Sequence, residues 1–360
     1  MAAGGGLLYG TAMDGSDTGG ATDLAALLAD PAWLPHRIAG GGVEFVHLPR
    51  WEQRALPFLD ERFIGEDVPR TKVPLDALAG AGLEAEGECH FIFHSALCCS
   101  TLLARALDLG GLATVLQEPQ ALVDLATARP GPDRGEDGRF ALDFVLALMQ
   151  RPHRAGEAAI LKPSNFANPL IGDLLDLRPK ARALLMYSKL PDFLLAVVRR
   201  GDFNRAWARR MATLFRRHPQ FETAERIDLL LLTDLQAASW VWLNHQAQFA
   251  RLVGERPGRV ATLETGAFLA DPARALLGAA ALFGLDLDEA GAEAIAAGPA
   301  FRQHAKRPRR AFDASAQKRE EAAAKFAYGA EIGSAVEWAE ALAARAGVKL
   351  GLEAPLPGRS

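Results

Sequence analysis

The sequence predicts an α/β fold in which a parallel β-sheet is covered by helices on both faces. Short apolar runs alternate along the chain with segments of helical periodicity, and strands that are joined through helices run parallel. Polar residues follow these apolar runs directly, as they do where strands end at the ligand-binding edge of an open sheet. With 360 residues, 49% of them hydrophobic, the chain has enough apolar surface for one substantial core and a smaller appendage.

The chain divides by composition into four parts. Residues 1–22, rich in Gly, Ala, Ser and Asp, predict a disordered amino terminus. Residues 23–86 are expected to form a small accessory region, in which the alternating run VEFVHLP at 43–49 indicates an edge strand. Residues 87–300 are expected to hold the α/β core, and residues 301–360 a basic loop followed by a helical carboxyl-terminal part.

The segment from His90 to Asp108 predicts a buried strand that turns sharply into a helix. The strand ends at Phe93, and small or hydroxylated residues lead into the helix. A helix opening has unpaired N–H groups and a partial positive charge, so it favours an anion such as a phosphate. The alternative is an ordinary turn of small residues between a strand and a helix. We expect a phosphate-binding loop formed by Ser95, Cys98, Cys99, Ser100 and Thr101.

Three further strands are expected to bring polar residues to the same edge of the sheet. Apolar runs at 113–116, 158–161 and 183–187 are followed directly by Gln117 and Glu118, by Lys162 and Ser164, and by Ser188 and Lys189. Because the carboxyl ends of parallel strands share one edge, these residues and the loop predict a single site.

The order of these motifs resembles the sulfotransferase superfamily, whose members have a P-loop-type α/β fold and use 3′-phosphoadenosine 5′-phosphosulfate as sulfuryl donor. The likeness covers roughly two thirds of the chain. The family's strand, loop, hydroxyl pair and Leu-Leu helix are similar to Phe91–Leu103, its E-P dipeptide to Glu118 and Pro119, and its K-P segment to Lys162 and Pro163. Further matches follow at Pro179, Ala181, Trp242, Asn244, Glu264, Asp271 and Pro272.

The chain departs from the family pattern at basic positions. The family's basic P-loop residue falls on Leu97 and its P-loop glycine on Cys99, while the arginine that binds the donor 3′-phosphate falls on Ser188. In the family a late basic loop folds over the adenosine and the 3′-phosphate. The resemblance therefore implies donor contacts from Ser188, Lys189, Lys306 and Arg307. A solvated basic loop is the alternative for the last two.

Glu118 and Lys162 are the candidate catalytic residues. Sulfuryl transfer needs a base for the acceptor proton and cations for the charge on the sulfuryl and phosphate oxygens. The resemblance implies that Glu118 is the base; the alternative is a glutamate that forms a salt bridge or caps the following helix. Lys162 ends an apolar strand, so its charge is either aimed at the ligand, which we favour, or paired with an acid.

Two histidines lie near these motifs. His94 follows the first strand and is a candidate phosphate contact, although a histidine beside an apolar strand is more often a hydrogen-bonded structural group. His245 shares a helix with Trp240, Trp242 and Phe249, and core packing is its expected role.

Composition limits the cofactors and partners. The three cysteines show no C-x-x-C spacing, and no metal is expected. The net charge is −4, and no aromatic residues interleave with the basic residues near the carboxyl end, so a nucleic-acid partner is not expected. The absence of a signal-like start and of roughly 18 consecutive apolar residues predicts a cytoplasmic protein without a membrane partner.

The sequence thus favours an enzyme that transfers a sulfuryl group to the hydroxyl or amine of a small-molecule or carbohydrate acceptor. Two alternatives remain. A small-molecule kinase or other phosphoryl transferase is disfavoured because the loop lacks G-x-x-x-x-G-K-[ST] and its phosphate-binding lysine. A non-catalytic nucleotide-binding module is consistent with the substitutions at Leu97 and Ser188.

Overall fold

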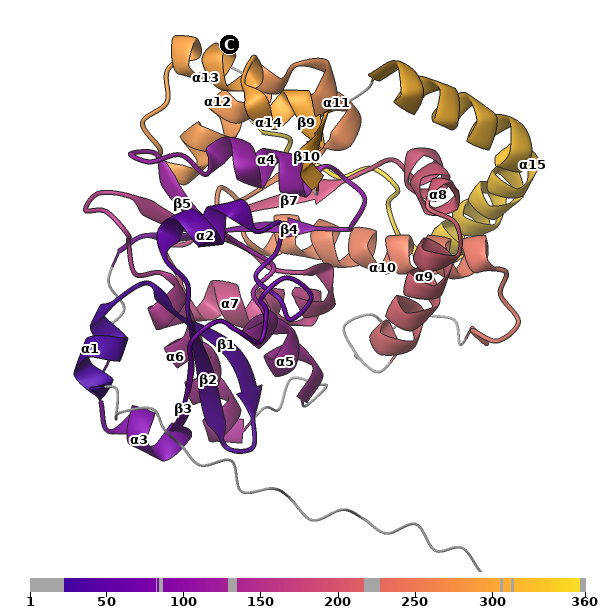
Figure 1. Cartoon of the computed structure of the whole chain (residues 1–360). Coiled ribbons are helices and arrows are strands. Elements are labelled where there is room, and N and C mark those ends of the chain that lie inside the picture. Colours follow the sequence, from indigo (N-terminus) through magenta and orange to yellow (C-terminus); the bar gives the residue numbers. More distant parts are fainter. Residues whose placement is uncertain are drawn as a thin grey trace, which may run out of the picture.

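The computed structural model describes residues 23–81, 83, 87–128, 135–216, 227–304, 307–311 and 314–356. At its centre lies a five-stranded parallel sheet with the strand order β5-β6-β4-β7-β8 (Figure 1). The strands are β4 (Cys89–His94), β5 (Ala113–Gln117), β6 (Ala158–Lys162), β7 (Ala183–Tyr187) and β8 (Val260–Glu264). The strands β4, β5, β6 and β7 each lie within one residue of the predicted run. The predicted disorder of residues 1–22 lies outside the described residues.

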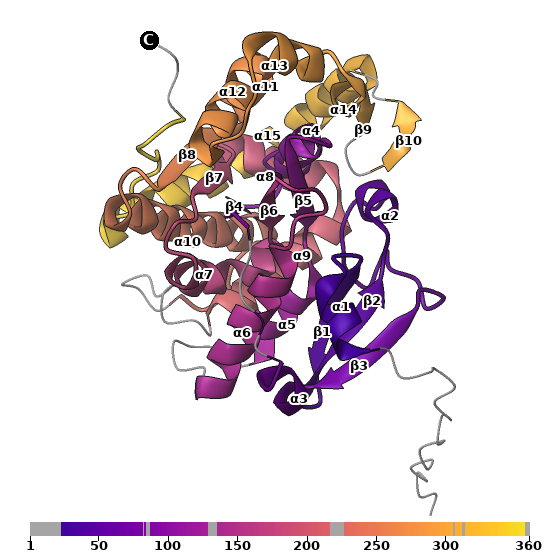
Figure 2. The same ribbon diagram turned by 90° about the vertical axis from the view of Figure 1, so that its left-hand side faces the viewer.

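Helices cover both faces of this sheet, which confirms the predicted fold class (Figures 1 and 2). Alternate residues of a strand point to opposite faces, so Phe91 and Phe93 pack on one face and Ile92 on the other. The Phe91 face is covered by α5 (Gln120–Ala128), α6 (Gly135–Met149), the 3₁₀ helix η1 (Asn165–Leu170), α7 (Ile171–Leu177) and part of α10 (Asp234–Glu255). The Ile92 face is covered by α4 (Ser100–Leu107), α11 (Thr265–Ala270), α12 (Pro272–Phe283) and α13 (Glu289–Ala296).

A helical lobe adjoins the sheet beyond β7. It consists of α8 (Leu190–Arg199), α9 (Asp202–Phe215), the first half of α10 and α15 (Ala314–Ala346), which share one buried apolar cluster. Gly347 follows α15 with φ of +67°, the left-handed conformation that ends helices, and Pro355 then pairs with Thr262 of β8. Between α13 and α15 lie α14 (Pro299–Arg302), β9 (Gln303–His304) and β10 (Arg307–Ala311).

The accessory region is a three-stranded antiparallel sheet with three short helices. Its elements are α1 (Leu24–Ala29), β1 (Trp33–Ala39), β2 (Gly42–His47), α2 (Arg50–Ala55), β3 (Arg70–Pro74) and α3 (Leu75–Ala79). The predicted edge strand at 43–49 is wrong, because β2 pairs with both β1 and β3. Leu34 and Val46 pack into the same apolar cluster as Phe91, so this sheet is fixed against the α/β core.

Candidate functional site

The loop between β4 and α4 has a left-handed backbone although it contains no glycine. Ala96, Leu97 and Cys99 have φ values of +69°, +53° and +59°. Side chains disfavour this conformation by roughly 1–3 kcal/mol per residue, and residues held in it cluster at functional sites. The loop is therefore shaped against the preference of its own residues.

Neighbouring strands hold this loop in place. The Ser95 N–H donates to the carbonyl of Met186 on β7 at 3.0 Å, and the Ser188 hydroxyl donates to the Leu97 carbonyl at 3.2 Å. The same hydroxyl lies 2.9 Å from Oγ1 of Thr265. Ser188, predicted to bind the donor, thus lies against the loop and fixes its backbone.

The loop ends in the first turn of α4, where Ser100 and Thr101 are 5% and 4% exposed. The first N–H groups of a helix have no partner within it, and together with the two hydroxyls they fit an anionic ligand. Burial raises the pKa of the neighbouring Cys98 thiol to about 11, although a backbone hydrogen bond with Ser100 and the charge of Lys162 act to lower it.

Glu118 has an unusual backbone at the end of β5. Its φ is +51°, and it precedes Pro119, a position that normally requires an extended backbone. The Glu118 N–H donates to the Lys162 carbonyl at 2.7 Å, so this turn is attached to the adjacent strand β6. Four of the five left-handed non-glycine residues in the described part of the chain lie at this edge of the sheet.

The two candidate catalytic side chains contact each other. Lys162 Nζ donates to Glu118 Oε1 at 2.6 Å; the lysine side chain has no exposed surface, and the glutamate side chain is 11% exposed. His94 Nε2 lies 3.8 Å from the same oxygen. Both alternatives of the sequence analysis, a glutamate in a salt bridge and a lysine paired with an acid, are thus observed. Of the two side chains, only that of Glu118 has exposed surface.

A segment of the accessory region completes this edge, and the sequence analysis did not place it beside Glu118. The Leu59 N–H donates to the Gln117 carbonyl at 2.8 Å, which places the loop after α2 beside Glu118. Phe58 lies with its ring centroid 5.4 Å from Lys162 Nζ. The guanidinium of Arg62 lies 5.3 Å from the same ring and binds the Asp60 carboxylate. A contact between residues so distant along the chain leaves no local sequence signal.

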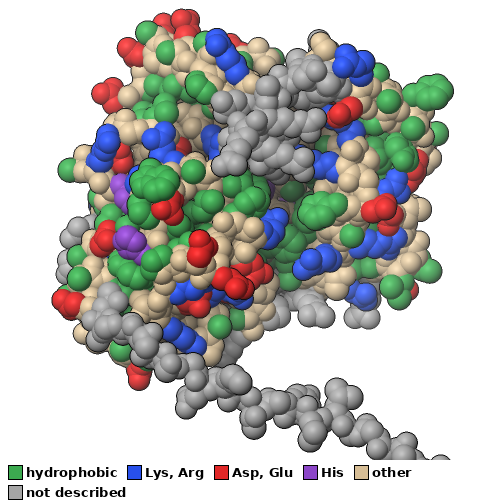
Figure 3. All heavy atoms as spheres, in the orientation of Figure 1, with side chains coloured by type: hydrophobic (Ala, Val, Ile, Leu, Met, Phe, Trp, Pro, Cys, Tyr) green, Lys and Arg blue, Asp and Glu red, His purple; other side chains and the backbone are tan. Residues whose placement is uncertain are grey.

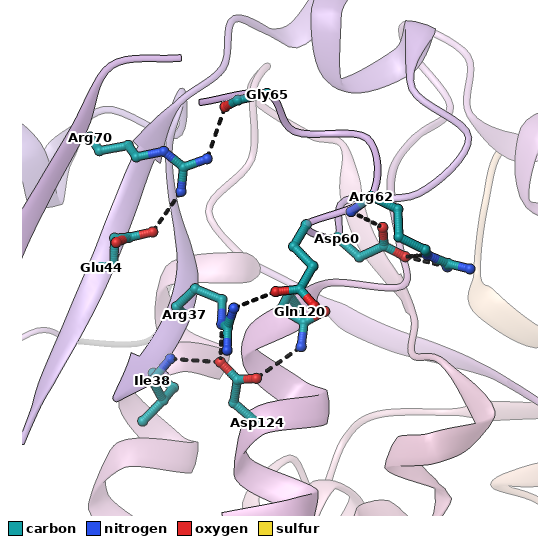
Figure 4. A network of polar contacts seen from close by, with 10 residues as sticks. Arg37, Ile38, Glu44, Asp60, Arg62, Gly65, Arg70, Gln120 and Asp124 are labelled. Atoms are coloured by element: carbon teal, nitrogen blue, oxygen red, sulfur yellow. Dashed lines mark hydrogen bonds and ion pairs between the residues drawn. The ribbon is translucent and has the colours of Figure 1, made fainter. Parts of the chain in front are cut away.

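A polar network attaches this loop to the core (Figure 4). Asp124 on α5 accepts hydrogen bonds from Arg37 Nε at 2.8 Å, from the Ile38 N–H at 3.0 Å and from Gln120 Nε2 at 2.8 Å. Arg37 also binds Glu61 at 2.5 Å. The accessory sheet, the loop and the start of α5 are therefore held together next to Glu118.

The other predicted donor contacts lie in different surroundings. Lys189 is exposed at the amino-terminal end of α8, next to Ser188. Lys306 and the side chain of Arg307 lie outside the described residues. Glu264 and Asp271, which match the family pattern, cap α11 and α12 through hydrogen bonds to the backbone.

The surface is hollowed between the accessory region and the helical lobe (Figure 3). Hydrophobic and basic side chains border this hollow (Figure 3). Nowhere in the described ranges do three or more His, Cys, Asp or Glu side chains gather as a set able to hold a metal ion. Within those ranges no helix is long and apolar enough to cross a membrane.

No family model and no curated protein matches the sequence. Among solved structures, the chain is similar to a sulfotransferase from Alicyclobacillus acidocaldarius, with 18% sequence identity and a TM-score of 0.38. The match covers 57% of this chain and 85% of that protein.

Proposed function

We propose that the chain is a sulfotransferase that moves a sulfuryl group from 3′-phosphoadenosine 5′-phosphosulfate to the hydroxyl or amine of a small-molecule or carbohydrate acceptor. The observation that carries this proposal is the Glu118–Lys162 ion pair beside a strained, left-handed loop that opens a helix. A base and an anion-binding loop at one edge of a parallel sheet are the two parts that the reaction needs.

The loop residues fit an anionic donor. The backbone from Leu97 to Thr101 leads into the positive end of α4, which favours a phosphate without a basic side chain at Leu97. When bound, the donor supplies a sulfuryl group attached to a phosphate leaving group. The N–H groups and hydroxyls of the first helical turn stabilise the negative charge left on that phosphate when its bond to sulfur breaks.

Glu118 takes the proton that the acceptor loses as its oxygen or nitrogen bonds to sulfur. In the described part of the chain the hydrogen bonds of this side chain engage Oε1, which leaves Oε2 for the acceptor. Lys162 is a positioning residue in this proposal, because its buried ammonium holds the carboxylate and has no exposed surface of its own.

The first test is thermal stabilisation by 3′-phosphoadenosine 5′-phosphate, compared with ATP and Mg²⁺. A ligand that binds only the folded state adds about 2.7 kcal/mol of stability at about 100 times its dissociation constant. We expect a shift with the bisphosphate alone. A shift only with Mg-ATP would favour a kinase, and the absence of both shifts would contradict the proposal.

A further inference from the structure

His94 contacts both halves of the proposed site through a single ring. It is the last residue of β4, it is 4% exposed, and it stands directly before the left-handed loop. One ring nitrogen faces the loop backbone and the other faces the carboxylate of Glu118.

The contact with the loop determines which ring nitrogen carries the proton. The Ala96 N–H donates to His94 Nδ1 at 3.1 Å. A backbone N–H can only donate, so Nδ1 must offer its lone pair, and the proton of the neutral ring is then on Nε2. The left-handed residue Ala96 is thus held by the side chain that precedes it by two positions.

The protonated nitrogen faces the proposed base. His94 Nε2 lies 3.8 Å from Glu118 Oε1, which is longer than a hydrogen bond. Catalytic hydrogen bonds are often long without substrate and shorten when the complex forms. Lys162 already donates to Oε1, so a second donor on that oxygen turns Oε2 toward the acceptor.

Buried groups fix the backbone of His94 from behind. Asn168 Nδ2 donates to the His94 carbonyl at 3.1 Å and lies 3.0 Å from His245 Nδ1. Both Asn168 and His245 are fully buried, and burial lowers the pKa of His245 to about 3, so its ring is neutral and accepts this hydrogen bond. The backbone that carries the His94 ring is therefore held in place by a buried hydrogen bond.

We infer that His94 is a positioning residue that couples the anion-binding loop to the general base: Nδ1 holds the loop in its left-handed form, and Nε2–H orients Glu118. This inference rests on the proposed function and adds to it a coupling between donor binding and proton transfer. An anion that fixes the loop conformation also fixes the orientation of the His94 ring, and the ring in turn orients the Glu118 carboxylate.

Two substitutions separate the two contacts. In His94→Asn the amide oxygen takes the place of Nδ1 and accepts from the Ala96 N–H, but the side chain at position 94 no longer reaches Glu118. In His94→Gln the amide reaches the place of Nε2, and the acceptor for Ala96 is lost. We expect His94→Asn to keep the dissociation constant of 3′-phosphoadenosine 5′-phosphate within about threefold and to lower kcat about 10- to 100-fold. We expect His94→Gln to weaken that binding about tenfold, the loss of one hydrogen bond, and to lower kcat by a smaller factor than His94→Asn does.

His90 supplies the matched control. It lies on the same strand, it is 5% exposed, and its Nδ1 likewise accepts a backbone N–H, that of Arg182, at 3.2 Å. His90→Asn and His90→Gln are expected to change the stability of the fold while leaving both the dissociation constant of the bisphosphate and kcat unchanged. The kinetic arm uses labelled donor with 2-naphthol and N-acetylglucosamine as acceptor probes, and the binding arm uses calorimetry.

The outcomes separate this inference from the proposed function. A wild-type protein that binds no bisphosphate and transfers no label would contradict the function, and nitrogen-15 spectra of the ring would still test the geometry. His94, assigned by the loss of its signal in the two variants, is expected as the Nε2–H tautomer. An Nδ1–H tautomer, or two variants that lower binding and kcat by the same factors, would overturn the inference.

Discussion

The ammonium of Lys162 donates a 2.6 Å hydrogen bond to Glu118 Oε1 from a position without any exposed surface. A buried charge without its partner is costly, so each member of this pair depends on the other. Loss of stability on replacing Glu118 therefore does not distinguish a base from a structural glutamate. Variants that separate the two roles are needed.

Replacing Glu118 alone is expected to affect both activity and stability. Glu118→Ala should lower the free energy of unfolding by about 3–5 kcal/mol, because it leaves the Lys162 charge buried and unpaired. Glu118→Gln should cost less stability, since its amide oxygen still accepts from Lys162, yet it should lower kcat about 100- to 10,000-fold because an amide takes no proton. Urea denaturation and single-turnover transfer measure the two quantities.

The control replaces both charges. In Glu118→Leu with Lys162→Met no unpaired charge remains, and apolar substitutes for a buried ion pair are often as stable as the pair. We expect unfolding close to that of the wild type together with the loss of transfer. A stable double variant that retains transfer would show that Glu118 is not the base.

The left-handed loop predicts an unusual sign for one glycine substitution. Ala96→Gly should leave stability unchanged or raise it by up to about 1 kcal/mol, because glycine adopts a φ of +69° without strain. Ala96→Val should lower it by about 2 kcal/mol, since a β-branched side chain tolerates this backbone least. Ala104, inside α4, is the control, where glycine should cost about 1 kcal/mol. Equal losses at both alanines would contradict the left-handed assignment.

The sequence predicted the sheet well because apolar runs and the polar residues after them depend on local burial. For the same reason it predicted that Glu118, Lys162 and the loop between β4 and α4 lie at one edge of the sheet. It did not predict that Glu118 and Lys162 contact each other, because that contact depends on the strand order β5-β6-β4, which no local pattern specifies. The alternation at 43–49 revealed a strand, but alternation does not tell how many neighbours a strand has.

The left-handed residues were also beyond prediction. A glycine or an asparagine marks such a backbone in a sequence, whereas Ala96 and Leu97 carry no such mark. The loop that contains them is held by a tertiary hydrogen bond from Ser188 to the Leu97 carbonyl and by a local one from the Ala96 N–H to His94. Cys99, with a φ of +59°, shows that this loop adopts a left-handed backbone without a glycine, which the sequence alone did not show.

His245 predicts how stability depends on pH. Burial lowers its pKa to about 3 in the folded protein, while the unfolded chain binds a proton near the ordinary value of 6.5. Between these values the unfolded state holds more protons, so this group's contribution to stability is complete above pH 6.5 and is lost as the pH falls. The slope is about 1.4 kcal/mol per pH unit.

His245→Asn should remove this slope while keeping an acceptor for Asn168. Denaturation between pH 4.5 and 6 measures the difference in slope, because in this range an ordinary histidine is mostly protonated in the unfolded chain while His245 is neutral in the folded protein. The variant also loses ring contacts with Phe215 and Phe249, which lowers its stability equally at every pH. Parallel pH profiles for the two proteins would show that His245 does not contribute.

The loop after α2 of the accessory region (the accessory loop) contains Phe58, and a double-mutant cycle can measure the coupling between Phe58 and Lys162. The Phe58 ring lies 5.4 Å from Lys162 Nζ, and both residues are buried, with 6% of Phe58 and 0% of the lysine side chain exposed. A cation over a desolvated ring contributes about 0.5–2 kcal/mol. Phe58→Leu keeps apolar volume but removes the ring face, so it should destabilise the wild type by more than it destabilises Lys162→Met, and the difference should be about 1 kcal/mol. The control is Phe144, which is 5% exposed on α6 and packs in a separate apolar cluster with Val43 and Phe45 of the accessory sheet. The losses of stability caused by Phe144→Leu and Lys162→Met should be additive. Additive losses at Phe58 would mean that the accessory loop merely covers the Glu118–Lys162 pair, whereas a measured coupling means that it helps to hold the ammonium against the carboxylate.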